Sequence, residues 1–299
     1  MPHTEIGGHR LALSNLDKVL YPATGFTKGD AIHYYASVAD VILPHLDGRP
    51  LSFLRYPDGV EAERFFTKHV PRGTPDWVTT HEITVVSRTP LHQVFIQDEA
   101  TLIWAANLAA LELHTPQWWV GHQAEADCLV FDLDPGEGAD ILDCRTLAEW
   151  LRERTARDGL TLLPKTSGSK GLHLLAPIEP TNSDEVSAYA KKLAREAEAD
   201  LPDHAVSKMA KDLRPGKVFV DWSQNNAAKT TAAPYTLRAK KRPTVSTPLT
   251  WDELTAARTP DDLVFLTSDL PSRIEANGDL LAPLLEAAGP RSGRAKLPG

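Results

Sequence analysis

The strongest structural signal in the chain is a predicted strand that ends in two acids, Cys128-Leu-Val-Phe-Asp-Leu-Asp-Pro135. Side chains alternate between the two faces of a strand, so Asp132 and Asp134 share one face and the apolar residues between them point the other way. Residues two apart on a strand have Cα atoms about 6.6–7 Å apart. Pro135 lacks a backbone donor and ends the strand. The segment therefore predicts two carboxylates that can converge on divalent cations, and such oxygen ligands favour Mg²⁺ or Mn²⁺ over zinc.

A second apolar run, Val218-Phe-Val-Asp221, also ends in an acid. A single Asp-x-Asp pair is common, and its ordinary interpretation is a pair of solvated or helix-capping side chains. A carboxylate at the end of another apolar strand needs a partner or a metal if it is buried. The hypothesis is therefore a metal site formed by Asp132, Asp134 and Asp221.

The remaining sequence alternates between helical and extended patterns, which predicts an α/β or α+β protein. Apolar spacing predicts helices over Ala31–Leu43, Thr101–Leu113, Leu142–Asp158 and Ser183–Ala199. Short apolar runs predict strands over Leu51–Tyr56, Val94–Ile96, Cys128–Leu133, His173–Ala176, Lys217–Val220 and Tyr235–Leu237.

The composition excludes several classes of protein. The 299 residues are 42% hydrophobic and 24% charged, which is typical of a folded domain and not of a disordered, collagenous or coiled-coil chain. The sequence has no apolar run of the roughly 18–20 residues that a membrane span needs. Residues 1–15 have no apolar core of a secretory signal, and two cysteines are too few for a disulfide framework. We therefore expect a cytoplasmic protein with no membrane association.

A small, basic, glycine-rich segment, Lys165-Thr-Ser-Gly-Ser-Lys-Gly-Leu-His173, leads into an apolar run. Backbone N–H groups in such a turn can bind an anion, and Ser167, Ser169, Lys170 and His173 would add side-chain donors to a polyphosphate. The spacing is not that of a P-loop. An ordinary flexible loop is the alternative interpretation.

The net charge of −8 would argue against a nucleic-acid partner if it were evenly distributed. It is not: Ala205–Arg242 has nine basic and two acidic residues, a net +7, so the remainder carries −15. Phe65 and Phe66 form an apolar pair within the charged stretch Glu61–His69. Core packing is the default interpretation of that pair, and stacking on nucleic-acid bases is the alternative.

Together these segments resemble the polymerase domain of bacterial ligase D, a branch of the archaeo-eukaryotic primase superfamily used in non-homologous end joining. The resemblance rests on matching stretches in order along most of the chain, which are Leu16–Pro22, Phe65–His69, Leu113-His114, Phe131–Asp134, Ser167–His173, Val218–Asn225 and the region of Arg238. Each stretch alone is weakly specific, and the set is highly specific.

The resemblance implies a two-lobed α/β fold with an RRM-like catalytic sheet. It implies a single primase-polymerase domain over 1–289, with an N-terminal lobe over about 1–110 and a catalytic lobe over about 111–289. Residues 290–299 are rich in Pro, Gly and basic residues, so we expect them to form a flexible tail.

The resemblance also implies roles for individual residues. Asp132, Asp134 and Asp221 would be catalytic and would hold two ions of Mn²⁺ or Mg²⁺. The implied nucleotide-binding residues are His114, Ser167, Lys170, His173 and Arg238. The implied DNA-binding residues are Lys18 and Lys28 for a 5′-phosphate, Phe65 and Phe66 for stacking, and Arg214 near the primer terminus.

The implied function is template-dependent addition of ribo- or deoxyribonucleotides to DNA 3′ ends, during gap filling and double-strand break repair. The implied partners are gapped or overhanging DNA ends with a 5′-phosphate, NTP or dNTP, and the proteins Ku and a DNA ligase. We expect association with the bacterial nucleoid during this work. Two alternatives are a haloacid-dehalogenase-like phosphatase, whose nucleophile motif is also an apolar run with Asp-x-Asp, and a catalytically inactive DNA-end-binding module.

Overall fold

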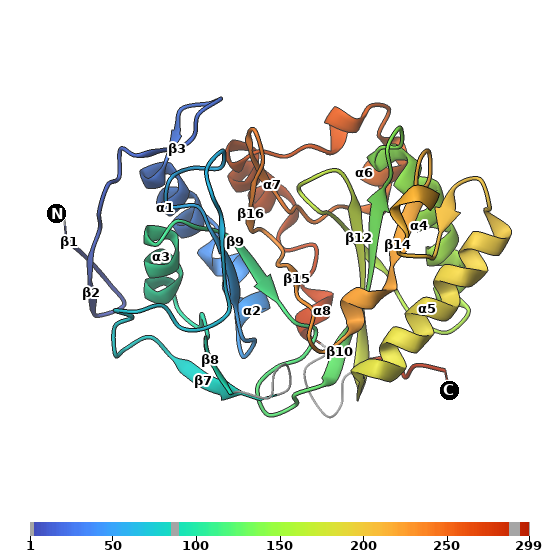
Figure 1. The fold of residues 1–299 in the computed structure, drawn as a ribbon, viewed down its shortest axis with the longest axis horizontal. Coiled ribbons are helices and arrows are strands. Elements are labelled where there is room, and N and C mark those ends of the chain that lie inside the picture. The colour runs from blue at the N-terminus through green and yellow to red at the C-terminus, as the bar shows by residue number, and fades with distance from the viewer. Residues whose placement is uncertain (1–2, 85–89, 287–293, 299) are drawn as a thin grey trace. The chain divides into compact units, whose positions relative to one another are not determined.

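The computed structural model describes residues 3–84, 90–286 and 294–298, which divide into two compact units (Figure 1). The first unit consists of Met1–Pro116, Thr231–Ser246 and Phe265–Gly278. The second unit consists of Gln117–Thr230, Thr247–Val264 and Asp279–Gly299. Both units are therefore discontinuous in sequence, whereas we expected two contiguous lobes that meet near residue 110. The first unit includes Thr231–Ser246 because a strand in that segment pairs within the sheet of the first unit.

That sheet has four strands in the order β15-β9-β5-β6, and every neighbouring pair is antiparallel. Its strands are β5 (Ser52–Arg55), β6 (Phe65–Thr67), β9 (Ala110–Thr115) and the late strand β15 (Thr231–Ala232). The unit also contains α1 (Lys28–Ser37), α2 (Ala39–Leu46), α3 (Glu99–Asn107) and α7 (Leu270–Asn277). Four two-stranded hairpins complete it: β1 (His3–Ile6) with β2 (His9–Ala12), β3 (Val19–Tyr21) with β4 (Phe26–Thr27), β7 (Thr80–Ile83) with β8 (Leu91–Val94), and β16 (Leu237–Ala239) with β17 (Pro243–Val245). Buried side chains of the sheet and of α1, α2 and α3 belong to one apolar core.

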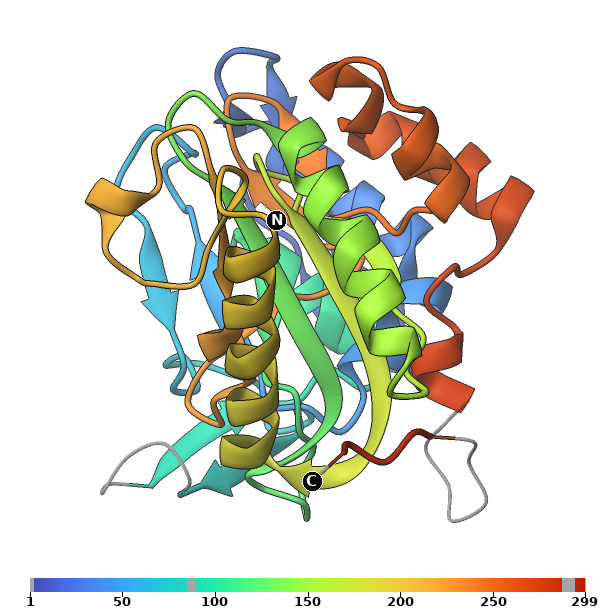
Figure 2. The same cartoon turned by 90° about the vertical axis from the view of Figure 1, so that its right-hand side faces the viewer.

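The sheet of the second unit has five strands in the order β11-β12-β10-β14-β13. The strands are β10 (Glu125–Pro135), β11 (Leu163–Thr166), β12 (Leu172–Asn182), β13 (Ala205–Val206) and β14 (Val218–Asp221), and only the β13–β14 pair is parallel. Figure 2 shows α4 (Ile141–Ala156) and α5 (Ser183–Asp200) side by side over one face of this sheet. The mixed α/β class expected from the sequence is confirmed, with two helices on one face of a largely antiparallel sheet.

The two long helices form where the sequence predicts them, because their ends are marked locally. The side chain of Asp140 caps α4 in a reciprocal capping box with Asp143, and Asn182 caps α5. Short helices complete this unit: α6 (Trp251–Ala256) and α8 (Pro283–Glu286). In the described part of the chain, no helix has both the length and the apolar character that crossing a bilayer requires.

The predicted helix over Thr101–Leu113 is wrong in its second half. Helix α3 ends at Asn107, Ala109 has a left-handed backbone with φ of 56°, and β9 begins at Ala110. Strand β9 lies between two other strands and is buried almost throughout. A buried strand is apolar without alternation, so its sequence cannot be distinguished from that of a buried helix.

The C-terminal segment also differs from the expected flexible tail, although residues 290–293 lie outside the described residues. Arg294 is buried, with its guanidinium 3.5 Å from the carboxylate of Asp127. It also donates hydrogen bonds of 3.1 Å to the backbone carbonyl groups of Asp127 and Ile178. Ala295 forms a bridge with Ile178 at the edge of β12. The composition of residues 290–299 predicted a flexible tail, but the buried ion pair between Arg294 and Asp127 attaches the chain at Arg294 to the rest of the second unit.

Candidate active site

Three aspartates come together on the central strands of the second unit. Asp132 on β10 lies directly opposite Asp221 on β14, and Asp134 lies two residues further along the same face of β10. Directly opposed residues on antiparallel strands have Cβ atoms about 4.5–5.5 Å apart. The sequence placed these acids at the ends of two strands. The strand register is what makes two of them neighbours.

Asp221 is held by the turn that follows its strand. Its carboxylate accepts hydrogen bonds from the backbone N–H of Ser223 at 3.0 Å and from the Ser223 hydroxyl at 2.6 Å. The side-chain amide of Gln224 donates a third bond at 2.9 Å. These donors orient the carboxylate and compensate part of its charge.

Asn225, at the end of the same turn, fixes the strand register. Its buried side-chain amide accepts a bond from the backbone N–H of Val130 and donates one to the Val130 carbonyl, both at 2.8 Å. Val130 precedes Asp132 by two residues on β10. The amide thus extends the pairing of β14 with β10 beyond Asp221, and it holds Asp221 opposite Asp132.

His173 is adjacent to the aspartates on the other neighbouring strand. It pairs with Asp132 across β10 and β12, and its Nε2 lies 3.3 Å from Oδ1 of Asp132. Both side chains are largely buried, with exposed fractions of 5% and 15% respectively. The structure therefore brings a predicted nucleotide-binding residue into direct contact with a predicted metal ligand.

The charge environment of Asp134 is dominated by burial and by its acidic neighbours. Burial, followed by the negative charge of Asp132, raises the pKa of Asp134 to about 6, while the positive charge of Lys170 opposes the shift. Lys170 donates a hydrogen bond to the carbonyl of Pro135, which places its ammonium group at the end of β10. Lys170 thus places a positive charge beside the carboxylates of the acidic face.

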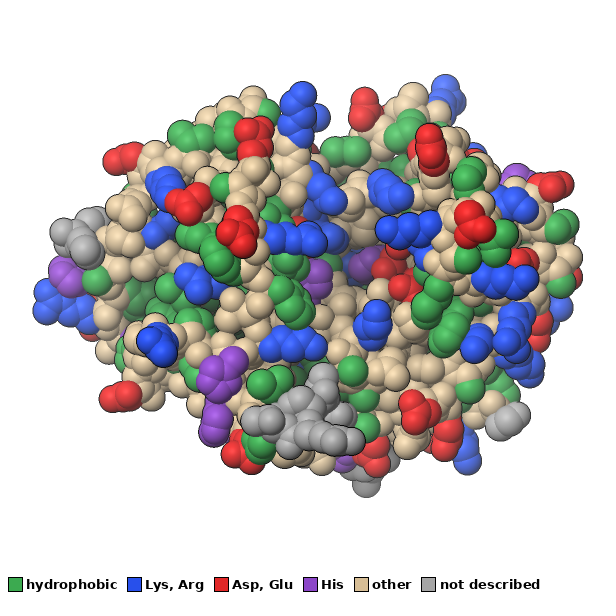
Figure 3. Space-filling model, in the orientation of Figure 1, with side chains coloured by type: hydrophobic (Ala, Val, Ile, Leu, Met, Phe, Trp, Pro, Cys, Tyr) green, Lys and Arg blue, Asp and Glu red, His purple; other side chains and the backbone are tan. Residues whose placement is uncertain are grey.

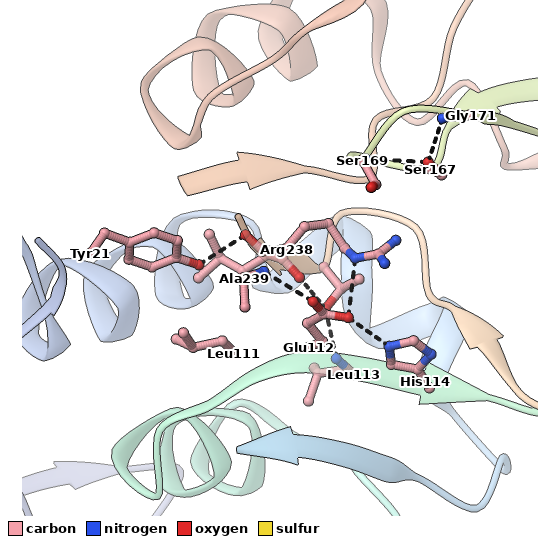
Figure 4. Close-up of polar contacts among 12 residues, drawn as sticks. Tyr21, Leu111, Glu112, Leu113, His114, Ser167, Ser169, Gly171, Arg238 and Ala239 are labelled. Carbon is pink, nitrogen blue, oxygen red and sulfur yellow. Dashed lines mark hydrogen bonds and ion pairs between the residues drawn. The ribbon is translucent and has the colours of Figure 1, made fainter. Parts of the chain in front are cut away.

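The glycine-rich loop between β11 and β12 is well organised. The hydroxyl of Ser167 accepts bonds of 3.2 Å from the backbone N–H groups of Ser169 and Gly171, as Figure 4 shows. Gly171 is required by close packing, because a Cβ atom there would lie 2.2 Å from the carbonyl oxygen of Leu133. The alternative of an ordinary flexible loop does not describe this segment, which is tied to the strand that carries the aspartates.

The donor chemistry of the aspartates fits a hard divalent cation, since three carboxylates meet with little compensating charge. Among the residues that the structure describes, however, no group of three or more His, Cys, Asp or Glu side chains is already arranged to hold a metal ion. Asp132 faces His173, and Asp221 is hydrogen-bonded to the turn that follows it. A cation at this face would compete with those partners for the carboxylate oxygens.

Arg214, predicted to lie near the primer terminus, belongs to this second unit. Its guanidinium stacks on the ring of Phe219 at 3.8 Å and donates a 2.6 Å bond to the carbonyl of Met209. Its positive charge contributes to the environment of Asp134. Gly136 allows this arrangement, because a Cβ atom at that position would lie 1.9 Å from the carbonyl oxygen of Arg214.

The two other predicted nucleotide ligands, His114 and Arg238, lie in the first unit. They are joined by Glu112, a buried residue that the sequence analysis did not identify (Figure 4). The Nε2 of His114 lies 2.9 Å, and the Nε of Arg238 lies 3.1 Å, from Oε2 of Glu112. The sequence feature that could have identified Glu112 is an acid inside the apolar run Leu111-Glu-Leu113, on the same strand face as His114.

A cavity of about 330 Å³ opens beside this cluster within the first unit. Its lining combines cationic, aromatic and apolar side chains with the one carboxylate, and consists of Leu54, Tyr56, Arg64, Phe66, Glu112, His114, Arg238, Ala239 and Lys240. Burial alone would raise the pKa of Glu112, but the hydrogen bond from His114 and the charge of Arg238 lower it to about 2. The carboxylate is therefore ionised at neutral pH, and Arg64, Arg238 and Lys240 leave the cavity with a positive balance.

Lys18 and Lys28, predicted to bind a 5′-phosphate, are close to each other in the first unit. The backbone N–H of Lys28 donates a 2.8 Å bond to the carbonyl of Lys18. Burial, and then the charge of Lys18, lower the pKa of Lys28. Lys18 also forms a 2.6 Å ion pair with the exposed Asp58, and Lys28 donates to the Ser14 hydroxyl at 3.1 Å. Two clustered ammonium groups suit an anionic ligand.

Phe65 and Phe66 are exposed, with exposed fractions of 46% and 55%. They lie on β6, which forms an edge of the four-stranded sheet. Core packing, the default interpretation of this pair, is therefore wrong. Exposed aromatic rings beside Arg64 and Lys68 suit stacking on nucleic-acid bases.

The basic segment Ala205–Arg242 is shared between the units, because the chain crosses from one to the other at Thr231. Figure 3 shows Lys and Arg side chains interspersed with Asp and Glu side chains on the face in view.

Comparison with known proteins identifies the family. Residues 27–281 match the model of the LigD primase-polymerase domain. A multifunctional non-homologous end joining protein LigD from Mycolicibacterium smegmatis is 45% identical over 278 residues, which cover 92% of this chain and 36% of that protein. The bifunctional LigD of Bacillus subtilis is 30% identical over 276 residues, which cover 90% of this chain and 43% of that protein. The chain thus spans well under half the length of these relatives.

A solved structure agrees with this match. The polymerase domain of Mycobacterium tuberculosis ligase D, in complex with DNA, superposes with a TM-score of 0.87 at 43% sequence identity. The similarity covers 94% of this chain and 99% of that one. The chain therefore belongs to the LigD primase-polymerase domain family, a family of metal-dependent nucleotidyltransferases that act as DNA/RNA polymerases.

Proposed function

We propose that this chain extends DNA 3′ ends by template-dependent addition of ribo- or deoxyribonucleotides, during gap filling and double-strand break repair by non-homologous end joining. The observation that carries the proposal is the register that sets Asp132 opposite Asp221, with Asp134 on the same face. The names of the related proteins and the DNA complex of a similar domain support it.

The proposed metal ligands are Asp132, Asp134 and Asp221, for two ions of Mn²⁺ or Mg²⁺. When bound, such ions neutralise the charge of the reacting phosphates and of the attacking oxygen. In the reaction the 3′-hydroxyl loses its proton to solvent and its oxygen bonds to the α-phosphorus, the bond from the α-phosphorus to the α,β-bridging oxygen breaks, and pyrophosphate leaves. This chemistry requires no protein nucleophile.

Ser167, Lys170 and His173 are proposed to bind the nucleotide triphosphate. Ser167 orders the loop, Lys170 supplies a positive charge at the end of β10, and His173 stands beside Asp132. His114 and Arg238 are proposed as nucleotide ligands in the first unit, where they line the positively charged cavity. Fixed donors of this kind hold the triphosphate in one orientation, which is a large part of catalysis in phosphoryl transfer.

The DNA-binding residues are proposed on the same basis. Lys18 and Lys28 would hold a 5′-phosphate, and the exposed rings of Phe65 and Phe66 would stack on bases. Arg214, near Asp134, would contact the primer terminus. Ku and a DNA ligase are proposed as partners at the break, and the bacterial nucleoid in the cytoplasm as the place of action.

A primer-extension assay on a gapped, 5′-phosphorylated duplex tests the proposal, with Mn²⁺ compared to Mg²⁺ and ribonucleotides to deoxyribonucleotides. Extension should depend on the metal and disappear in the Asp132→Ala/Asp134→Ala variant, while binding to the DNA end persists. The exposed Asp203→Ala in the same unit is the matched control and should retain activity.

Extension that survives the double substitution would refute the assignment of the aspartates. Hydrolysis of a small phosphomonoester without extension would favour the phosphatase alternative. End binding without either activity in the unaltered chain would favour an inactive end-binding module.

A further inference from the structure

The carboxylate of Glu112 makes three contacts to groups that flank the cavity of the first unit. Oε2 faces Nε2 of His114 at 2.9 Å and Nε of Arg238 at 3.1 Å. Oε1 accepts a 3.0 Å bond from the backbone N–H of Ala239. Figure 4 shows the three partners converging on this single side chain.

These contacts connect two elements that are not paired by a β-ladder. Glu112 and His114 lie on β9, whereas Arg238 and Ala239 lie on β16, which pairs only with β17 among the described strands. A second bond joins β9 to the residue just before β16, where the Thr236 hydroxyl accepts a 2.8 Å bond from the N–H of Leu113. The segment that carries Arg238 is therefore attached to β9 at Thr236 and at Ala239, and the Arg238 side chain forms an ion pair with Glu112.

The same contact determines which ring nitrogen of His114 carries its proton. An ionised carboxylate only accepts hydrogen bonds, so the nitrogen that faces it must be a donor. Glu112 therefore keeps the proton of neutral His114 on Nε2 and leaves Nδ1 as an acceptor. Arg238 contacts Glu112 through its charge: Nε lies 3.1 Å from Oε2 as an ion pair outside hydrogen-bond geometry, and the two terminal nitrogens point away from Glu112 (Figure 4).

We propose that Glu112 is a positioning residue for nucleotide binding: it fixes the His114 tautomer, holds the Arg238 guanidinium by an ion pair, and does not itself contact the nucleotide. This inference rests on the proposed function. All three acceptor positions in use on the carboxylate face protein donors, and its side chain is 6% exposed. A carboxylate in direct contact with a triphosphate would repel it, whereas one that orients two cationic or polar groups favours it.

The decisive variant is Glu112→Gln, which keeps the shape of the side chain. Its oxygen can still accept from the N–H of Ala239, so β16 stays attached. Its amide nitrogen then faces the donors of His114 and Arg238, so the His114 proton must move to Nδ1 and the Arg238 contact is lost. Loss of an orienting partner typically costs about 10–100-fold. We expect KM for the nucleotide to rise by about that factor, with a smaller change in kcat.

Affinity for the gapped DNA itself should stay within about twofold of the unaltered chain, since a nucleotide-positioning residue does not contact DNA. Nucleotide affinity measured directly, by titration of a non-hydrolysable nucleotide onto the protein–DNA complex, should fall with KM. The control is Glu5→Gln, an exposed acid of the first unit. It should change none of these quantities.

A thermodynamic cycle separates positioning from a direct role. If Glu112 acts through its two partners, adding Glu112→Gln to a His114→Ala/Arg238→Ala variant should raise KM no further. An additional tenfold rise in that background would overturn the proposal, and so would an unchanged KM in the single variant. Should Glu112→Gln fail to fold, Glu112→Asp keeps the charge, withdraws it from both partners, and must raise KM in the same direction.

The outcomes also separate this inference from the proposed function. If the unaltered chain does not extend primers, the proposed function fails. The titration with the non-hydrolysable nucleotide then still decides whether Glu112 controls nucleotide affinity.

Discussion

The two units each contain carboxylates that are at least partly buried, but with opposite surroundings. In the second unit, Asp132, Asp134 and Asp221 stand beside one another, and burial together with Asp132 raises the pKa of Asp134 to about 6. In the first unit, Glu112 stands between His114 and Arg238, and these partners hold its pKa at about 2 despite burial. The same functional group is thus destabilised when ionised at one site and stabilised at the other.

The difference shows which cluster has its carboxylate charge compensated by groups of the protein itself. Glu112 finds its compensating donors within the protein, so its charge contributes to the stability of the fold. Burial and the charge of Asp132 raise the pKa of Asp134, so the ionised form of Asp134 costs free energy until a cation neutralises it. A cluster of the first kind positions other side chains, whereas a cluster of the second kind is suited to bind an exogenous cation.

The largest expected effect is on activity. Asp134→Asn should lower nucleotide addition by at least about 1000-fold, because a metal ligand is lost. The same change removes a like charge, so in the presence of EDTA it should stabilise the second unit by about 1–2 kcal/mol at pH 7. Urea unfolding and primer extension measured on one preparation test both. A destabilised Asp134→Asn variant would show that the aspartates are not the uncompensated cluster described here.

The next effect is the pH dependence of stability due to Glu112. Its pKa is lowered from 4.5 to about 2 in the folded chain, so the folded state favours the ionised form. The stabilisation is fully present above pH 4.5 and is lost as the pH falls toward 2. It is on the order of 3 kcal/mol.

Unfolding of the unaltered chain and of Glu112→Gln, measured from pH 7 to pH 3, checks this expectation. The stability difference between them should shrink as the pH falls. A difference that stays constant over this range would contradict the ionic role of the Glu112 carboxylate.

The smallest expected effect tests whether the strand register, with all three aspartates unchanged, controls the acidic cluster. Asn225→Ala leaves both backbone groups of Val130 without their amide partner, which should cost about 2 kcal/mol. Nucleotide addition should fall as well, because Asp221 is no longer held opposite Asp132. The exposed neighbour Asn226→Ala is the control for urea unfolding and primer extension. Equal losses in the two variants would refute a specific role of Asn225 in the register.

Residue type and alternation along the chain were enough to identify several features. Strand alternation placed Asp132 and Asp134 on one face, and the glycine-rich segment around Ser167 was predicted as a polar turn. These features depend on the local backbone alone, which is why a sequence reports them. The family resemblance supplied the rest of the candidate residues, because it compares whole patterns and not single spacings.

Burial and pairing between distant segments were not predictable in the same way. Leu111–Leu113 was predicted as helix, since a central strand and a buried helix share the same apolar composition. Glu112 was overlooked because its partners Arg238 and Ala239 lie more than a hundred residues away. The exposure of Phe65 and Phe66 likewise depends on their position at a sheet edge.

The sequence by itself thus determined which chemical groups are available: three aspartates on apolar strands, a small basic loop, and a mixed α/β class. The tertiary structure alone decided which charges meet. Strand register set Asp132 opposite Asp221, and the return of the chain at Thr231 brought Arg238 to Glu112. The physical reason is that a carboxylate's pKa and role depend on the charges within a few ångströms of it, and those neighbours are set by folding and not by sequence distance.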